Sequence, residues 1–366
     1  MTVGDVISRL ESLAPPSLQE SYDNAGLICG DAAAVCTGII VALDSTEDVV
    51  LEAIRNNCNM VVAHHPIVFR GIKKLTGKNY VERTLITAIK NDIAIFAIHT
   101  NLDNISAGVS QKMASAIGLE NTRILAPKAD QLCKLYTFVP NSHAEKVRDA
   151  VFSAGGGQIG KYAECSFSSE GIGSFKAGEG TNPYAGKKGE LHFENETKLE
   201  IIFPVWAERE IIKALLAAHP YEEVAYDIIA LQNEHPGTGS GIVGELAEAM
   251  EETAFLALLA RNFDVPVIRH TRLRGRMVKK VAVCAGAGSF LIPNALAEKV
   301  DFFISGDFKY HEFFDADGRI TIADIGHFES EQQSIDLLLA FLQENFRTFA
   351  TLKTTVRTNP VLYYKT

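Results

Sequence analysis

Apolar runs alternate with amphipathic segments along the first 130 residues of the chain. The short runs rich in β-branched residues, each predicted to be a strand, are Gly38–Leu43, Met60–Ala63 and Ile93–Ile98. The segments predicted to be helices follow them, from the cap residues Asp44–Thr46 to about Asn56, at Tyr80–Asn91 and at Val109–Gly118. This order predicts βαβ units, and therefore a parallel sheet whose strands end at one common edge.

The last 130 residues repeat this alternation of predicted strands and helices. Their predicted strands are Lys279–Cys284, Asp301–Ser305 and Ile320–Ile325. Each is followed by a polar turn and a helix, the last of which runs to about Asn345, and Thr351–Arg357 is a candidate edge strand. We therefore expect two architecturally similar, βαβ-rich halves with mostly parallel sheets.

The middle of the chain has a different order of elements. Its predicted strands and extended runs are Lys134–Pro140, Tyr162–Ser168, Gly189–His192, Leu199–Val205 and Val224–Leu231. Its predicted helices are His143–Ala154 and Glu208–Ala218. The β-α-β-β-α-β order fits a ferredoxin-like α+β unit. Glycines around 171–186 favour a long hairpin over a mobile loop, and Asn233–Gly241 is expected to be a linker.

A chain of 366 residues is too long for one ordinary core. We therefore expect a discontinuous α/β main domain, residues 1–130 and 236–366, interrupted by an inserted α+β domain, residues 131–235. The net charge of −10 and the pI of about 5.5 argue against nucleic acid as a partner.

The sequence shows no secretory signal and no apolar run near the ~20 residues that cross a bilayer, so no membrane partner is expected. The six cysteines include no C-x-x-C pair. They indicate reduced thiols in a cytoplasmic protein, and neither a disulfide framework nor a zinc knuckle.

Two adjacent histidines, His64 and His65, stand between a predicted strand and Pro66. Ligands and chemistry gather at the carboxyl edge of an α/β sheet, and this is where the two imidazoles are placed. Neighbouring histidines at a strand end can turn toward one cavity and serve two different ions. For a single strand-end histidine, a hydrogen-bonded structural role is the common alternative.

Further histidines and acids follow other predicted strands. His99 precedes Asp103, and His327 lies four residues before Glu331 at the start of a helix, so that the latter pair shares one helical face. Histidine and carboxylate ligands suit zinc, iron or manganese. Two such ions would repel each other unless carboxylates bridged them, and together they could activate a water at neutral pH.

Two other motifs could contact a substrate. Gly286-Ala287-Gly288 lacks most of a dinucleotide fingerprint, and an anion-binding backbone nest is a better interpretation. Arg70, Lys73 and Lys74 could bind an anionic substrate, although such a cluster is more often a solvated loop.

These elements together resemble a known family, the Nif-three-like dinuclear-metal hexameric proteins, often called GTP cyclohydrolase I type 2 homologues. The motifs that carry the resemblance are Tyr22-Asp23-Asn24-Ala25-Gly26-Leu27, Ala63-His64-His65-Pro66, His99-Thr100-Asn101-Leu102-Asp103, Ser305-Gly306-Asp307-Phe308-Lys309-Tyr310-His311-Glu312 and Gly326-His327-Phe328-Glu329-Ser330-Glu331. The family usually has Trp at the position of Tyr22. Ala218-His219-Pro220-Tyr221-Glu222-Glu223 resembles the inserted domain of the longer bacterial members, which is similar in fold to the signalling protein P-two and to CutA.

The resemblance implies two divalent metal ions held by His64, His65, Asp103, His327 and Glu331. It also implies a toroidal homohexamer whose sites face an internal cavity. Asp23 and Asn24 are expected to orient a local turn.

The family's label implies a metal-dependent hydrolase that acts on a nucleotide or a related small molecule. His99 and His311 are the candidates for the proton transfer. The alternative is a non-catalytic metal-binding regulator or scaffold whose inserted domain acts as a sensor or lid.

Overall fold

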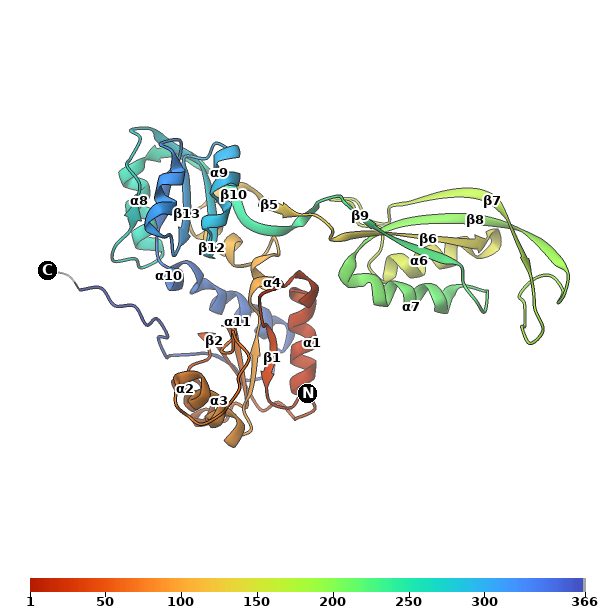
Figure 1. Ribbon diagram of the computed structural model, residues 1–366, viewed down its shortest axis with the longest axis horizontal. Coiled ribbons are helices and arrows are strands. Elements are labelled where there is room, and N and C mark those ends of the chain that lie inside the picture. Colours follow the sequence, from red (N-terminus) through yellow and green to blue (C-terminus); the bar gives the residue numbers. More distant parts are fainter. Residues whose placement is uncertain (365–366) are drawn as a thin grey trace. The chain divides into compact units, whose positions relative to one another are not determined.

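The computed structural model describes residues 1–364, and its internal contacts divide the chain into two compact units. The first unit joins residues 1–127 to the chain from residue 237 onward, and the second is Lys128–Pro236. Figure 1 shows the elements of each unit. The molecule is a mixed α/β protein with three sheets in the part of the chain described.

The first sheet of the first unit has the strand order β1-β4-β3-β2-β15. Its central strands β2 (Ile39–Asp44), β3 (Met60–His65) and β4 (Ala94–Ala97) are parallel, as their sequence predicts. Strand β1 (Gly26–Cys29) lies antiparallel at one edge, and β15 (Thr351–Lys353) pairs with β2 at the other. Strand β3 extends two residues further than predicted, so both histidines of the pair belong to it.

The second sheet has the order β11-β14-β13-β12-β10-β5. Strands β12 (Met277–Ala287), β13 (Phe302–Gly306) and β14 (Thr321–Asp324) are its parallel part. The other strands are β5 (Leu119–Lys128), β10 (His235–Glu251) and β11 (Arg269–His270), of which β10 and β11 pair antiparallel with β12 and β14. This sheet is therefore mixed, whereas the alternation of strands and helices in the sequence predicted a mostly parallel sheet.

Strand β10 corrects the prediction of a linker at Asn233–Gly241. Its glycines permit close backbone packing, because a Cβ on Gly239 would lie 2.2 Å from the carbonyl oxygen of Ala126 in β5. Gly239 and Gly241 also have φ values of +147° and +67°, which favour glycine. The glycines that look like a flexible joint in the sequence are part of a sheet.

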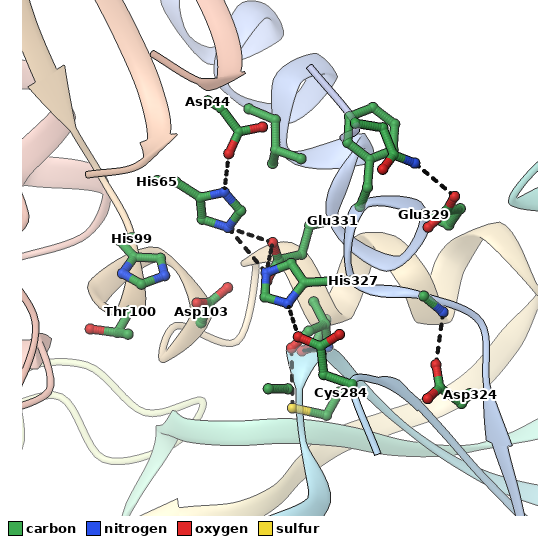
Figure 2. A pocket seen from close by; sticks show the side chains of 18 of the residues that line it. Asp44, His65, His99, Thr100, Asp103, Cys284, Asp324, His327, Glu329 and Glu331 are labelled. Carbon is green, nitrogen blue, oxygen red and sulfur yellow. Dashed lines mark hydrogen bonds and ion pairs between the residues drawn. The ribbon is translucent and has the colours of Figure 1, made fainter. Parts of the chain in front are cut away.

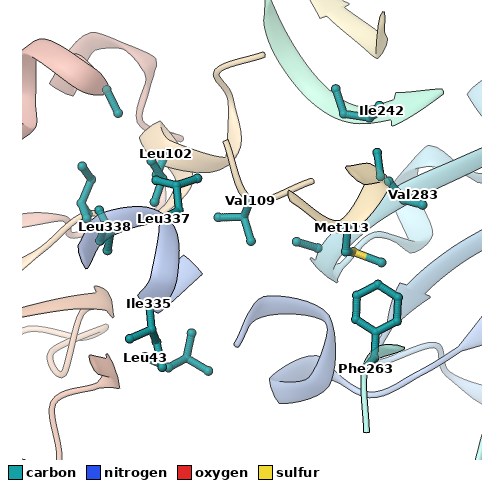
Figure 3. Packing of buried hydrophobic residues seen from close by; sticks show 14 of the residues in the cluster. Leu43, Leu102, Val109, Met113, Ile242, Phe263, Val283, Ile335, Leu337 and Leu338 are labelled. Carbon is teal, nitrogen blue, oxygen red and sulfur yellow. The ribbon is translucent and has the colours of Figure 1, made fainter. Parts of the chain in front are cut away.

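One apolar core connects the two sheets of the first unit. Helix α5 (Val109–Ala116) contacts β12, and α11 (Gln333–Asn345) contacts both α5 and β2. Leu43, Val109, Met113, Val283 and Leu338 belong to this one cluster of buried side chains (Figure 3). Burial of their apolar surface stabilises the unit and holds the carboxyl edges of both sheets near each other.

The remaining helices of the first unit lie around these sheets. They are α1 (Val3–Leu13), α2 (Glu47–Arg55), α3 (Tyr80–Lys90), α4 (Thr100–Asp103), α8 (Glu252–Asn262), α9 (Ile292–Ala297) and α10 (His327–Glu331). Thr46 and Asn79 cap α2 and α3 by accepting hydrogen bonds from backbone N–H groups. The single helix predicted up to Asn345 is divided at Gln332 into α10 and α11.

The second unit contains β6 (Leu132–Pro140), α6 (Ala144–Ser153), β7 (Ser166–Lys176), β8 (Leu191–Pro204), α7 (Glu208–Ala218) and β9 (Tyr226–Leu231). Its antiparallel sheet has the order β7-β8-β6-β9. Side chains of the sheet and of both helices, among them Leu135, Val147, Phe203 and Leu215, form its core. Strands β7 and β8 form a long hairpin, and β8 merges two runs predicted as separate.

Candidate metal centre

Three chain segments bring titratable side chains to one place in the first unit. His64 and His65 lie at the end of β3, Asp103 lies in the short helix α4, and His327 and Glu331 lie one turn apart in α10. Figure 2 shows His65, Asp103, His327 and Glu331 pointing toward one another. All five residues that the family resemblance implies are thus brought together.

The carboxylate of Glu331 lies between two groups of side chains. Its Oε2 is 2.7 Å from His65 Nε2 and 3.0 Å from His327 Nε2. Its Oε1 is 3.8 Å from His64 Nε2, which is itself 3.6 Å from Asp103 Oδ1. The two oxygens therefore face different ligand sets.

The distances permit metal binding by three overlapping sets of residues. The sets whose ligand atoms all lie within 4.8 Å of one another are His65 with His327 and Glu331, His64 with Asp103 and Glu331, and His64 with His65 and His99. Nitrogen and carboxylate oxygen donors of this kind bind zinc, iron and manganese. The donor set of the cluster therefore fits divalent metal ions.

Two buried polar atoms in the cluster support this fit. His64 Nε2 and Asp103 Oδ1 are buried and have no hydrogen-bond partner among the described residues. His64 Nδ1 donates to the carbonyl oxygen of Ile98 at 2.9 Å, so the lone pair of Nε2 is directed into the cluster. Burial of such atoms without a partner is unfavourable, and a metal ion would supply the partner.

Two carboxylates outside the cluster, those of Asp44 and Asp307, orient the imidazole rings of His65 and His327. Asp44 accepts from His65 Nδ1, Asp307 accepts from His327 Nδ1, and both N···O distances are 2.8 Å. A carboxylate behind a histidine fixes the ring and leaves Nε2 for a metal ion, as in many metalloproteins. Thr358, near the carboxyl-terminal end of the chain, donates in turn to the second oxygen of Asp44.

These carboxylates also change the protonation of the histidines. Burial disfavours the charged form of His65, but Asp44 and Glu331 outweigh it and raise its pKa to about 9. For His327 the same opposition between burial and the carboxylates of Asp307 and Glu331 raises the pKa to about 11. Burial alone would raise the pKa of Glu331, yet the three histidines around it lower that pKa well below its ordinary value. The carboxylates are thus arranged to stabilise positive charge in the cluster.

Gly286 has a steric role at this centre. A Cβ on this residue would lie 2.2 Å from Glu331 Oε1, and its φ of +67° also favours glycine. Its N–H donates to Ser330 Oγ at 2.9 Å, so this group is not free to bind an anion. Gly286 lets Glu331 approach β12, which gives the first glycine of the motif a steric reason.

The two histidines considered for proton transfer lie in different surroundings. The ring of His99 is 5.3 Å from that of His64, and its Nδ1 donates to Asp23 at 2.8 Å. Asp23 also accepts from Thr100, so it orients the start of α4. His311 lies in a short 3-10 helix, is exposed, and contacts Tyr310 and Phe314, so the structure does not bring it into the cluster.

The outer residues Asp44, Asp307 and Thr358 were not predicted from the sequence. The parallel pairing of β2 with β3 places Asp44 opposite His65, so strand order would have pointed to it. Asp307 is the residue after β13, with a φ of +59°. Thr358 follows β15, and its sequence gives no signal for its contact with Asp44.

Comparison with known proteins decides the family of the chain. The sequence pattern that defines Duf34/NIF3 (NGG1p interacting factor 3) matches residues 1–360. The chain belongs to the Duf34/NIF3 family. A Halalkalibacterium halodurans protein named GTP cyclohydrolase 1 type 2 homolog is 40% identical over 325 residues, which are 88% of this chain and 87% of the relative. A Bacillus subtilis protein of the same name is 38% identical over 88% of this chain and 87% of the relative.

Solved structures agree with this membership of the Duf34/NIF3 family. A Bacillus cereus protein described as related to NIF3 has a TM-score of 0.88 and 36% sequence identity, over 100% of this chain and 99% of that one. The family resemblance predicted from the motifs is therefore confirmed. Among residues 1–364, no helix is long and apolar enough to cross a membrane.

Proposed function

We propose that the cluster binds two divalent metal ions and that the chain is a hydrolase acting on a nucleotide or a related small molecule. The observation that carries this proposal is the position of Glu331, whose two oxygens face different ligand sets. His64, His65, Asp103, His327 and Glu331 would hold zinc, iron or manganese. Two ions bound there would supply an activated water and a Lewis acid.

The chain's own residues would complete the chemistry. His99 borders the cavity that holds the cluster, and its Nδ1–H is donated to Asp23. Its Nε2 is therefore the atom that would accept a proton from the attacking water and then pass it to a departing nitrogen or oxygen. Asp44 and Asp307 would hold the rings of His65 and His327 in place while the substrate reacts.

The test of this proposal compares matched variants of the full chain. Metal-loaded protein is assayed against GTP and a panel of nucleotides and phosphoesters, beside Glu331→Gln and the exposed control Glu248→Gln. We expect turnover in the parent and in the control, and a loss of about a hundredfold or more in Glu331→Gln. Equal rates in the parent and in Glu331→Gln, or no turnover in either, would contradict the hydrolase.

The second candidate function is a metal-binding regulator or scaffold. It is favoured by a separate cavity of about 780 Å³ within the second unit, between the β7–β8 hairpin and residues 221–225. A ligand bound there could be sensed without any reaction. Stable metal content with no turnover of any substrate would favour this function over the hydrolase.

The proposal also covers the division of the chain into domains and its oligomeric state. We interpret residues 131–235 as an inserted ferredoxin-like domain and residues 1–130 with 236–366 as the metal-binding domain, because the second unit has the β-α-β-β-α-β order. Membership of the family supports a toroidal homohexamer. Light scattering of the purified protein would measure its oligomeric state.

A further inference from the structure

Seven carboxylates of the described residues line the cavity that holds the metal cluster. The cavity has a volume of about 800 Å³, enough for a ligand the size of a nucleoside. Asp44, Asp103, Asp307 and Glu331 surround its histidines. Glu20, Asp324 and Glu329 line other parts of it. Two divalent ions would neutralise only part of this negative charge.

The cavity offers little to bind a phosphate chain. Among residues 1–364, Arg269 carries the one guanidinium that lines the cavity, and no lysine lines it. The Arg269 guanidinium already donates to the Asp324 carboxylate and to the carbonyl oxygen of Phe308. Proteins that bind nucleoside triphosphates place free arginines, lysines or backbone N–H groups around the phosphates. In the part of the chain described, the side chains that line the cavity include no lysine and no second arginine for this purpose.

The anion sites considered from the sequence do not supply a phosphate-binding group to the cavity. Arg70, Lys73 and Lys74, which the sequence suggested as an anion site, are exposed and do not line the cavity. The N–H of Gly286, in the suggested backbone nest, is donated to Ser330. The basic cluster therefore does not line the cavity, and the Gly286 N–H of the glycine motif is already bonded.

Aromatic rings form the apolar part of the lining. Tyr22, Phe69, Phe290, Phe328 and Tyr363 all border the cavity. Phe69 and Phe290 are 56% and 62% exposed, so their faces are available to a ligand. Phe69 also lies edge-on to His99, with 6.0 Å between the ring centroids. Exposed rings beside a reactive centre suit a planar heterocycle, which stacks on them without needing charge.

We infer that the substrate of this site is an uncharged planar heterocycle of nucleoside size, and that nucleoside triphosphates are poor ligands. The inference rests on the proposed function because it names the substrate class of the same site. A triphosphate would meet seven carboxylates in a cavity whose one arginine among residues 1–364 is already paired with Asp324, and these carboxylates would repel it. A neutral ring system would gain the stacking surface and avoid this repulsion.

The test measures binding to the full chain, with and without added metal. Guanosine and neopterin are the uncharged probes, GTP is the charged one, and tripolyphosphate reports on the phosphates alone. Calorimetry at low salt should show guanosine or neopterin binding about tenfold more tightly than GTP. Raising the salt concentration should tighten GTP binding, because screening weakens repulsion, and should leave the uncharged probes unchanged.

Matched phenylalanine variants test the stacking surface. Phe69→Ala and Phe290→Ala should each weaken binding of the uncharged probe about tenfold. Phe314→Ala is the control, because Phe314 is similarly exposed, at 66%, but does not line the cavity. The Phe314→Ala variant should bind the uncharged probe with the same dissociation constant as the parent.

Several outcomes would overturn the inference. The first is that GTP binds as tightly as both uncharged probes. The second is that GTP binding weakens with salt while tripolyphosphate competes for the site. The third is that neither uncharged probe binds. Failure of the proposed hydrolase looks different. In that case turnover is absent, yet the order of affinities and the effects of the phenylalanine variants remain as predicted.

Discussion

His65 Nε2 lies 2.7 Å from Glu331 Oε2, although 266 positions separate the two residues in the chain. His65 belongs to the first sheet of the unit, and Glu331 belongs to a helix that contacts β12 and β13 of the second. The contact therefore exists only when both halves of the unit are folded against their common core. Local geometry at either residue cannot produce it.

Removal of one histidine from each half should empty the centre. In the double variant His64→Ala, His327→Ala we expect most of the bound metal to be lost, because each ligand set loses at least one imidazole. Elemental analysis of the purified protein measures this, and circular dichroism checks the fold. His270→Ala is the control, since His270 is an exposed histidine in β11. Full metal content in the double variant would show that the ions bind elsewhere.

Substitution of Gly286 should disturb Glu331 without touching a ligand. Gly286→Ala places a Cβ where Glu331 Oε1 now lies, so metal affinity should fall about tenfold or more. Gly275→Ala is a matched control, because Gly275 has a φ of +70° but no atom within 4 Å of the added Cβ. Both variants should lose about 1 kcal/mol of unfolding free energy from backbone strain. Metal titrations that give equal affinities for both variants would contradict this role of Gly286.

Metal binding should release protons at neutral pH. The pKa of His65 is raised to about 9 and that of His327 to about 11, so both rings are protonated at pH 7 in the metal-free protein. A metal ion must displace about two protons, and its apparent affinity should rise with pH up to about 11, more steeply below pH 9 than above it. Calorimetry in buffers with different ionisation enthalpies measures the number released. A heat independent of the buffer would contradict the prediction.

The same shifts predict how the stability of the metal-free protein depends on pH. Because the folded pKa values lie above the ordinary value of 6.5, the folded state binds more protons between pH 6.5 and about 9 to 11. The stabilisation is complete below pH 6.5 and is lost as the pH rises through the folded values. Urea denaturation of metal-free protein should therefore show lower stability at pH 9 than at pH 7. Increased stability at the higher pH would contradict these assignments.

An ion pair remote from the centre should show the opposite pH dependence. The hydrogen bonds from Arg123 and Lys280 to Glu298 lower the pKa of this carboxyl to about 2, so its stabilisation is present above pH 4.5 and is lost as the pH falls through 2. Glu298→Gln should cost about 0.5–1 kcal/mol at pH 7, because the pair is partly exposed. The difference from the parent should shrink at pH 3, whereas Glu248→Gln should show no loss at either pH. A loss that is equal at both pH values would contradict the pair.

The sequence predicted the parallel strands and the five residues of the cluster, because apolar runs and the polar residues after them are local signals. It missed the antiparallel pairing of β10 and β11, since pairing depends on contacts between distant segments. The outer carboxylates Asp44 and Asp307 were missed for the same reason, because a single acid after a strand is common. His311 was included because it follows the strand ending near Gly306, but the chain turns it toward solvent.

The path of the chain through the first unit has a consequence for how the protein is made. During translation the segment carrying His64 and His65 leaves the ribosome long before His327 and Glu331 are synthesised. Strand β15, which completes the sheet beside β2, is made later still. A nascent chain therefore carries His64, His65 and Asp103 of the proposed site before His327 and Glu331 exist, and the two candidate ligand sets that contain Glu331 can form only after most of the polypeptide has been synthesised. The bridging position of Glu331 is therefore the last part of the proposed site to be completed.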